Sequence, residues 1–209
     1  MFDFNIMSLV AGLPGLLLAL VLHEYAHARV AVAMGDFTPR FTGRLTLNPV
    51  AHIDPIGLIM LLVAHFGWAK PVMVNPRNFR DMRRGNILVA LAGPAANFVT
   101  AFVAMFLMIL MYRLNVDMSI GVKTVLSMIV LFNVNFGIFN LIPLPPLDGS
   151  KILLEFLPRE YAYKYMGIER YSFIILIVMM MTPILGGILI PLSQLILGLF
   201  ETVISIILL

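Results

Sequence analysis

The chain has 209 residues, of which 61% are hydrophobic, and its mean hydropathy is +0.99. That apolar fraction exceeds the roughly 45–50% of a soluble globular domain and indicates an integral membrane protein. The net charge of +3 suggests no nucleic-acid partner, and we interpret the basic residues as topology signals and contacts to lipid headgroups. The absence of cysteine excludes disulfides and thiolate ligands, so only His, Asp and Glu could bind a metal.

The first long apolar segment, about Ile6 to Met34, is predicted to be a membrane-spanning helix that Gly35 and Asp36 end. It lacks a basic leader and a small-residue cleavage site, so we expect a retained helix rather than a signal peptide. The following segment, Phe37 to Val50, alternates loosely between apolar and polar residues around a glycine. This pattern predicts a short strand or a small β-hairpin-like insertion.

The middle of the chain contains one short and two long apolar segments. The piece from Ile56 to Trp68 is too short to span a bilayer comfortably, which favours a re-entrant or interfacial element. A basic loop separates it from a second predicted membrane helix, about Asn86 to Tyr112. A third helix is expected from about Thr124 to Ile142, where a proline-rich run ends it.

The C-terminal part begins with a mixed stretch, Ser150 to Arg170, that predicts an interfacial amphipathic helix followed by a loop. The remainder, about 171–209, is apolar but interrupted by prolines and glycines. We expect two membrane segments there, and one kinked span plus an interfacial helix is the alternative. The predicted fold class is therefore an all-α polytopic membrane protein with about five transmembrane segments, within a range of four to six.

The distribution of basic residues predicts the orientation in the membrane. If the N-terminus faces outside, all of the 14 lysines and arginines except Arg113 and Lys123 lie on the cytoplasmic side. The reversed topology would invert that distribution, so we expect the N-terminus outside.

A His-Glu-x-x-His motif, His23-Glu24-Tyr25-Ala26-His27, lies near the end of the first apolar segment. Histidines four residues apart project from one helix face and can bind one Zn²⁺, while the glutamate can act on a water beside it. Ionisable residues within a membrane helix are costly, and metal coordination would offset much of that cost. The alternative is that the motif lies at the membrane–water interface and its side chains extend to water.

Asp148, just beyond the third predicted helix, is the best candidate for a third metal ligand. The first and third helices run in the same direction, so the end of the third arrives at a similar depth to His23, nearer the cytoplasmic face. A catalytic zinc takes three protein ligands and leaves one position open, and a carboxylate commonly completes a pair of histidines.

Three motifs in order along the chain resemble the site-2 protease family of intramembrane zinc metalloproteases. They are the His-Glu-x-x-His turn, Gly93-Pro94-Ala95-Ala96-Asn97, and the run from Asn140 to Gly149 that contains Asn140-Leu141-Ile142-Pro143 and Asp148-Gly149. The resemblance covers roughly residues 15–155. Because no linker, internal repeat or low-complexity tract divides the sequence, we expect a single membrane-embedded metalloprotease domain over 1–209 without an added soluble domain. Its core would be about 6–155, followed by the C-terminal membrane segments at about 171–209.

The resemblance also implies residue roles: one zinc held by His23, His27 and Asp148, with Glu24 as general base. Asn140 matches a family asparagine, and we assign it to substrate binding or oxyanion stabilisation.

The roles of two further polar residues are left open by the sequence. Asn97 would form a hydrogen bond near the site or act as a polar clamp between helices. His52 would contact the substrate, support a ligand, or have a purely structural role, which we favour.

The function expected from these features is hydrolysis of peptide bonds in or near transmembrane segments of other membrane proteins. The expected partners are transmembrane protein substrates and the lipid bilayer, with no nucleic acid, and the sequence leaves the oligomeric state unknown. The expected location is the cell membrane. The alternative is a metal-binding membrane protein or transporter without peptidase activity, which the lack of a second row of acids or histidines disfavours.

Overall fold

The computed structural model describes residues 6–64 and 67–209 of the chain. Within these ranges all regular elements are helices, which confirms the all-α prediction. Four described helices are long and apolar enough to cross a membrane, at the lower limit of the expected range: Gly12–Met34, Met82–Arg113, Ile120–Leu141 and Ile184–Ile207.

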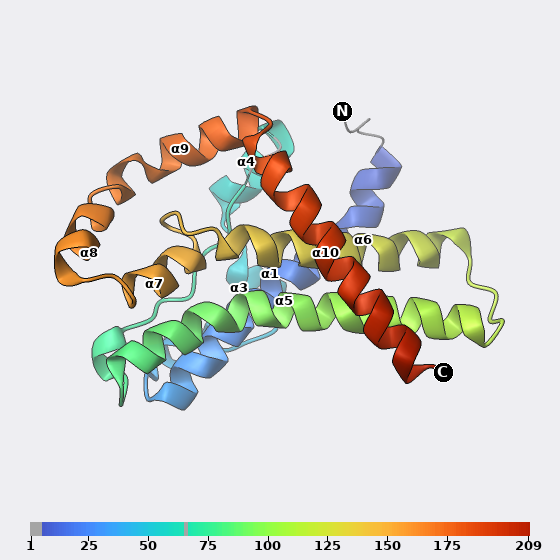
Figure 1. Cartoon of the computed structure of the whole chain (residues 1–209), viewed down its shortest axis with the longest axis horizontal. Helices are drawn as coiled ribbons and strands as arrows, with labels where there is room; N and C mark the ends of the chain where they lie inside the picture. The colour runs from blue at the N-terminus through green and yellow to red at the C-terminus, as the bar shows by residue number, and fades with distance from the viewer. Residues whose placement is uncertain (1–5, 65–66) are drawn as a thin grey trace.

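Three long helices, α1 (Ile6–Met34), α5 (Met82–Arg113) and α6 (Ile120–Leu141), pack against one another, and α10 (Ile184–Ile207) crosses α5 and α6 obliquely (Figure 1). The predicted bounds of α1 are confirmed. Helices α5 and α6 begin about four residues earlier than predicted because Asp81 and Ser119 cap them, each side chain accepting a hydrogen bond from a backbone N–H of the first turn.

Small residues allow the three helices to approach closely. A Cβ atom on Gly15 of α1 would lie 2.8 Å from the backbone oxygen of Met128 in α6, so the two backbones meet there. The apolar core between α5 and α6 consists of Ala101, Ala104, Val130, Val134 and Ile138, and side chains of α10 pack on it. Large apolar side chains that stay exposed on α5 and α10 are suited to contact with lipid.

The prediction of a strand or β-hairpin-like insertion at residues 37–50 is wrong. The segment contains the short helices α2 (Thr38–Phe41) and the start of α3 (Pro49–His52), joined by a turn with Gly43 at a φ of +69°. A proline in the first turn of each helix has a φ suited to a helix. This local preference outweighs the weak preference for a strand that the alternation of apolar and polar residues suggested.

The short apolar piece forms α4 (Pro55–Ala64), and residues 65–66 of the predicted element lie outside the described ranges. After an isolated antiparallel bridge between Ile53 and Ala69, the segment from Pro71 to Asn75, called the extended run below, contains no helix. It enters the 3₁₀ helix η1 (Pro76–Asn78) with Asn75 in an extended conformation.

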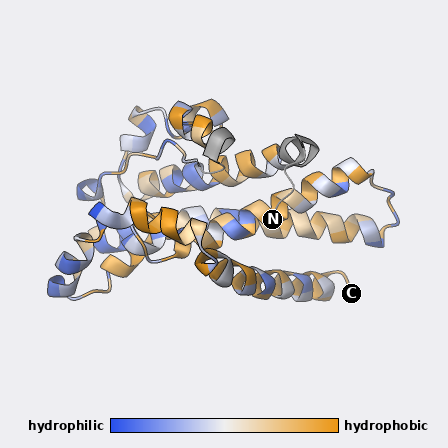
Figure 2. Cartoon of the chain, turned by 90° about the horizontal axis from the view of Figure 1, so that it is seen from above, coloured by the Kyte–Doolittle hydropathy of each residue, from blue (hydrophilic) through white to orange (hydrophobic). Residues whose placement is uncertain are grey.

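The C-terminal third is more helical than predicted. In place of one amphipathic helix and a loop, the stretch after α6 forms α7 (Asp148–Leu154) and α8 (Arg159–Met166). Helix α9 (Glu169–Met181) is too short to count among the candidate spans, and the chain breaks at Thr182-Pro183 before α10, which continues through Pro191. Hydrophilic residues concentrate at the end of the molecule where α8 lies, on the left in Figure 2.

Asp36, which follows α1, connects the end of this helix to the extended run through hydrogen bonds. Its buried carboxylate accepts hydrogen bonds from the backbone N–H and hydroxyl of Thr38, from the backbone N–H of Asn75 and from the Asn78 amide. Burial acts to raise the pKa of Asp36, but these hydrogen bonds outweigh burial and hold the pKa below its ordinary value. The charged form is therefore part of the folded state.

We predict that Asp36→Ala lowers the free energy of unfolding by about 1–3 kcal/mol at neutral pH, because buried donors lose their acceptor. A lowered pKa contributes stability that is complete above the unfolded value, near 3.8, and lost as the pH falls through the folded value. The stability of the variant should therefore fall less in acid than that of the parent.

The measurement is thermal unfolding in detergent between about pH 7 and pH 3, spanning the carboxylate range. Asp117→Ala, in the exposed loop between α5 and α6, is the control and should behave like the parent. The same stability and acid dependence in Asp36→Ala as in the parent would contradict the assigned role.

Candidate active site

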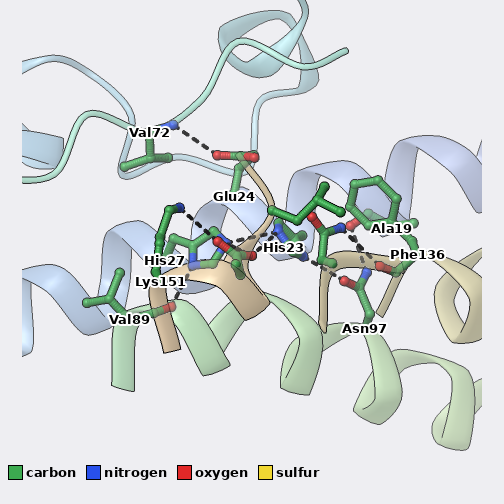
Figure 3. Close-up of polar contacts among 12 residues, drawn as sticks. Ala19, His23, Glu24, His27, Val72, Val89, Asn97, Phe136 and Lys151 are labelled. Atoms are coloured by element: carbon green, nitrogen blue, oxygen red, sulfur yellow. Dashed lines mark hydrogen bonds and ion pairs between the residues drawn. The ribbon is translucent and has the colours of Figure 1, made fainter. Parts of the chain in front are cut away.

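His23 and His27 lie one turn apart on α1 and point toward the same place, as Figure 3 shows. Their Nε2 atoms are 2.9 Å apart and the rings are nearly perpendicular, at 88°. Both side chains are buried, with 3% and 7% of their surface exposed. The i, i+4 spacing thus brings two imidazole nitrogens together away from solvent.

Asp148, the first residue of α7, brings a carboxylate to the same point. Its Oδ2 atom lies 3.1 Å from Nε2 of His23 and 3.0 Å from Nε2 of His27. The other oxygen, Oδ1, accepts a hydrogen bond from Nζ of Lys151 at 2.9 Å. The predicted ligands His23, His27 and Asp148 are therefore brought together from α1 and α7, and they form a group that could hold a metal ion.

Hydrogen bonds to the Nδ1 atom of each ring determine whether a neutral ring has a proton or a lone pair on Nε2. Nδ1 of His23 lies 2.8 Å from Oδ1 of Asn97, and Nδ1 of His27 lies 2.6 Å from the backbone oxygen of Val89. Both partners accept hydrogen bonds, so in a neutral imidazole Nδ1 carries the proton and Nε2 presents a lone pair.

The donor set fits a divalent cation. Two Nε2 atoms face each other and the buried Oδ2 atom of Asp148, for which the described residues provide no hydrogen-bond partner. Without a positive charge between them, three such atoms repel one another. Two imidazoles and one carboxylate are a typical protein ligand set of catalytic zinc.

Gly93 of α5 allows α5 to pass close to this group. A Cβ atom there would lie 2.5 Å from both Cε1 of His23 and Nε2 of His27, which is too close for any side chain. The glycine of the Gly93-Pro94 motif is thus required for the close packing of α5 against the two rings. Pro94 itself stays inside α5, and the helix continues through it.

Glu24 lies beside the histidines but points in a different direction, toward the extended run above α1 (Figure 3). Its Oε2 atom accepts a hydrogen bond from the backbone N–H of Val72 at 2.9 Å. Only 9% of its surface is exposed. One oxygen of the carboxylate is thus positioned by the backbone.

A cavity of about 520 Å³ opens next to these residues. Glu24, His23, His27, Asp148 and Asn140 all line it. Its remaining walls include the extended run and parts of α5 and α7. They carry apolar side chains such as Val72, Val74, Val89 and Leu154, and also the polar Asn86 and Glu155. The candidate metal ligands and the Glu24 carboxylate therefore border one cavity.

Of the other predicted site residues, Asn140 lines the cavity, whereas Asn97 and His52 do not. Asn140 borders the cavity and donates a hydrogen bond to the backbone oxygen of Phe136 in its own helix. Asn97 lies behind His23 rather than in the cavity lining. His52 is fully buried, its Nε2 lies 2.8 Å from the backbone oxygen of Thr46, and it does not line the cavity.

Several contacts of the site were not predicted from the sequence. Lys151 follows Asp148 by three residues at the start of a helix, a spacing that predicts a side-chain pair and could have been recognised. Pro76 follows the extended run, and a proline favours extended backbone in the residue before it, which is Asn75. The contact of Glu24 with Val72 and that of His27 with Val89 leave no local signal in the sequence, because they depend on long-range packing.

Comparisons with known proteins identify a matching family and several relatives. The family described as "Peptidase family M50" matches residues 108–183, a range that includes Asn140 and Asp148. The chain is 42% identical over 173 residues to "Putative zinc metalloprotease YwhC" of Bacillus subtilis, covering 81% of this chain and 79% of the relative. It is 32% identical over 180 residues to "Putative zinc metalloprotease Rip2" of Mycolicibacterium smegmatis, covering 83% of this chain and 68% of the relative.

No solved structure matches the chain. The similarity to these relatives extends over most of both sequences, well beyond the motifs themselves. The chain therefore belongs to peptidase family M50, the site-2 protease family of zinc metalloproteases.

Proposed function

We propose that this chain is an intramembrane zinc endopeptidase that hydrolyses peptide bonds in or near transmembrane segments of other membrane proteins. The observation that carries the proposal is the cavity in which Glu24 borders the group formed by His23, His27 and Asp148, next to helices long enough to span a bilayer. A peptide that enters this cavity from the membrane meets the metal ligands and the carboxylate together.

The three buried side chains would hold the zinc, because their ligand atoms converge and, in the part of the chain that the structure describes, Asp148 Oδ2 has no hydrogen-bond partner. When bound, zinc polarises a peptide carbonyl and lowers the pKa of a water molecule, so that the water can attack at neutral pH. Lys151 holds the second carboxylate oxygen of Asp148 and thereby directs the first oxygen toward the histidines.

Glu24 would move the proton. Its Oε2 atom is held by the N–H of Val72, which leaves Oε1 to accept a proton from the attacking water. The same carboxyl group then delivers that proton to the nitrogen of the leaving amine as the peptide C–N bond breaks. Asn140, in the cavity wall, has a carboxamide that can hydrogen-bond the substrate or the oxygen that gains negative charge.

The position of the site along the helices supports an active site near the cytoplasmic face. His23 and His27 lie in the second half of α1, Val89 lies in the first half of α5, and Asp148 follows α6, so all three helices reach the site near the same end. The exposed basic residues of α8 and of the loop before α5 extend from that end, as expected for a cytoplasmic surface of the cell membrane.

Replacement of Glu24 by glutamine tests the proposed chemistry. Glutamine keeps an oxygen for the Val72 N–H but cannot take a proton, so Glu24→Gln should retain zinc while cleavage of a transmembrane substrate falls about 10²–10⁴-fold. Zinc content is measured in purified protein, and cleavage is measured in detergent or liposomes.

Glu160→Gln, on the exposed face of α8, is the matched control and should cleave like the parent. Cleavage by Glu24→Gln at the parent rate would refute the role of Glu24. A parent that binds zinc but cleaves no transmembrane substrate would instead favour the alternative of a metal-binding or transport protein.

The orientation is testable because the chain contains no cysteine. We expect Val116→Cys, in the exposed loop between α5 and α6, to react with a membrane-impermeant maleimide on intact cells. Lys164→Cys, exposed on α8, should react only after the membrane is permeabilised. The opposite labelling pattern would contradict a cytoplasmic active site.

A further inference from the structure

Two buried asparagines connect three helices behind His23. Asn97 of α5 and Asn133 of α6 are both fully buried. The Nδ2 atom of Asn97 donates to the backbone oxygen of Ala19 in α1 at 2.8 Å and to Oδ1 of Asn133 at 3.0 Å. Asn133 in turn donates to the backbone oxygen of Ile129 at 2.8 Å. This amide network leads from the backbone of α6 to the ring of His23.

The directions of these hydrogen bonds follow from the two backbone oxygens at its ends. A backbone oxygen can only accept, so Asn133 must direct its NH₂ group to Ile129 and its oxygen to Asn97. Asn97 must likewise direct its NH₂ group to Ala19, which leaves Oδ1 facing Nδ1 of His23. A neutral His23 ring therefore donates from Nδ1, and its lone pair then lies on Nε2, which is 3.1 Å from Oδ2 of Asp148.

The two histidines differ in what determines their tautomer. His27 donates to the backbone oxygen of Val89, which no side-chain change removes. His23 depends on the side chain of Asn97, whose own orientation depends on Asn133. If the amide were absent, His23 could place its proton on Nε2 and point an N–H group at the cation.

We propose that Asn97, oriented by Asn133, is a positioning residue that fixes the Nδ1-protonated tautomer of His23 and thereby sets the affinity of the site for a divalent cation. The inference rests on the proposed metal site, and it adds a role to Asn97 and to a second residue, Asn133. Partners that orient a metal-binding histidine typically contribute 10- to 100-fold in metal affinity.

The competing role is a clamp between helices, because Asn97 also joins α5 to α1 and α6 through its NH₂ group. Two substitutions of similar shape separate the roles. Asn97→Leu removes both the oxygen and the NH₂ group, whereas Asn97→Asp removes the NH₂ group and keeps an oxygen for His23. A clamp fails in both variants, whereas tautomer positioning fails only in Asn97→Leu.

The experiment measures zinc affinity of the purified full-length chain in detergent by competition with a chelator, alongside the unfolding temperature. We expect Asn97→Leu to bind zinc about 10- to 100-fold more weakly than the parent. Asn97→Asp should bind much more like the parent, although both variants lose thermal stability. Asn133→Leu should weaken binding in the same direction.

Equal loss of zinc affinity in Asn97→Leu and Asn97→Asp, or parent affinity in Asn97→Leu, would overturn the positioning role. A parent that binds no zinc would instead refute the metal site itself, so the two failures are distinguishable.

A second measurement covers variants that fail to fold. The chain contains four histidines, so nitrogen-15 NMR of the zinc-free parent can report their tautomers, with His23 assigned from a His23→Ala sample. We expect a protonated Nδ1 and an unprotonated Nε2 on His23. The reverse assignment would overturn the inference.

Discussion

The convergence of three lone pairs inside a bundle of apolar helices is the constraint on which the rest of the structure depends. Nε2 of His23, Nε2 of His27 and Oδ2 of Asp148 repel one another unless a cation joins them, so the fold must hold them in place. Gly93 lets α5 pack directly against both rings. The hydrogen bonds of Asn97 and Val89 then fix which nitrogen of each ring faces the group.

Helix α1 carries two of the candidate metal ligands and also contacts the extended run that borders the cavity. It carries the two histidines on one face, and Glu24 beside them reaches the N–H of Val72 in the extended run. Asp36, just after the end of α1, holds the same run at Asn75. Two acidic side chains from one part of the chain thus anchor the segment that borders the cavity, so a change in the packing of α1 would affect the metal ligands and the cavity wall together.

The sequence predicted the features that depend on local spacing. The bounds of α1 follow from an apolar run ended by Gly35, which has a φ of +112°, and the convergence of His23 and His27 follows from one helical turn. The predicted strand at residues 37–50 failed because prolines at the starts of α2 and α3 favour helical turns. Asn133 and Val72 were missed because their contacts join distant parts of the chain, and an isolated polar residue or backbone group gives no local pattern.

X-ray absorption at the zinc edge of the purified full-length protein tests the central claim most directly, because it reports the atoms bound to the metal. The account predicts one zinc per chain with two imidazole ligands and additional oxygen ligands, at about 2.0–2.2 Å. The imidazole signal should decrease when either His23 or His27 is replaced by alanine. Zinc bound without imidazole, or with a ligand set that neither histidine substitution changes, would contradict the assignment of His23, His27 and Asp148 as the metal site.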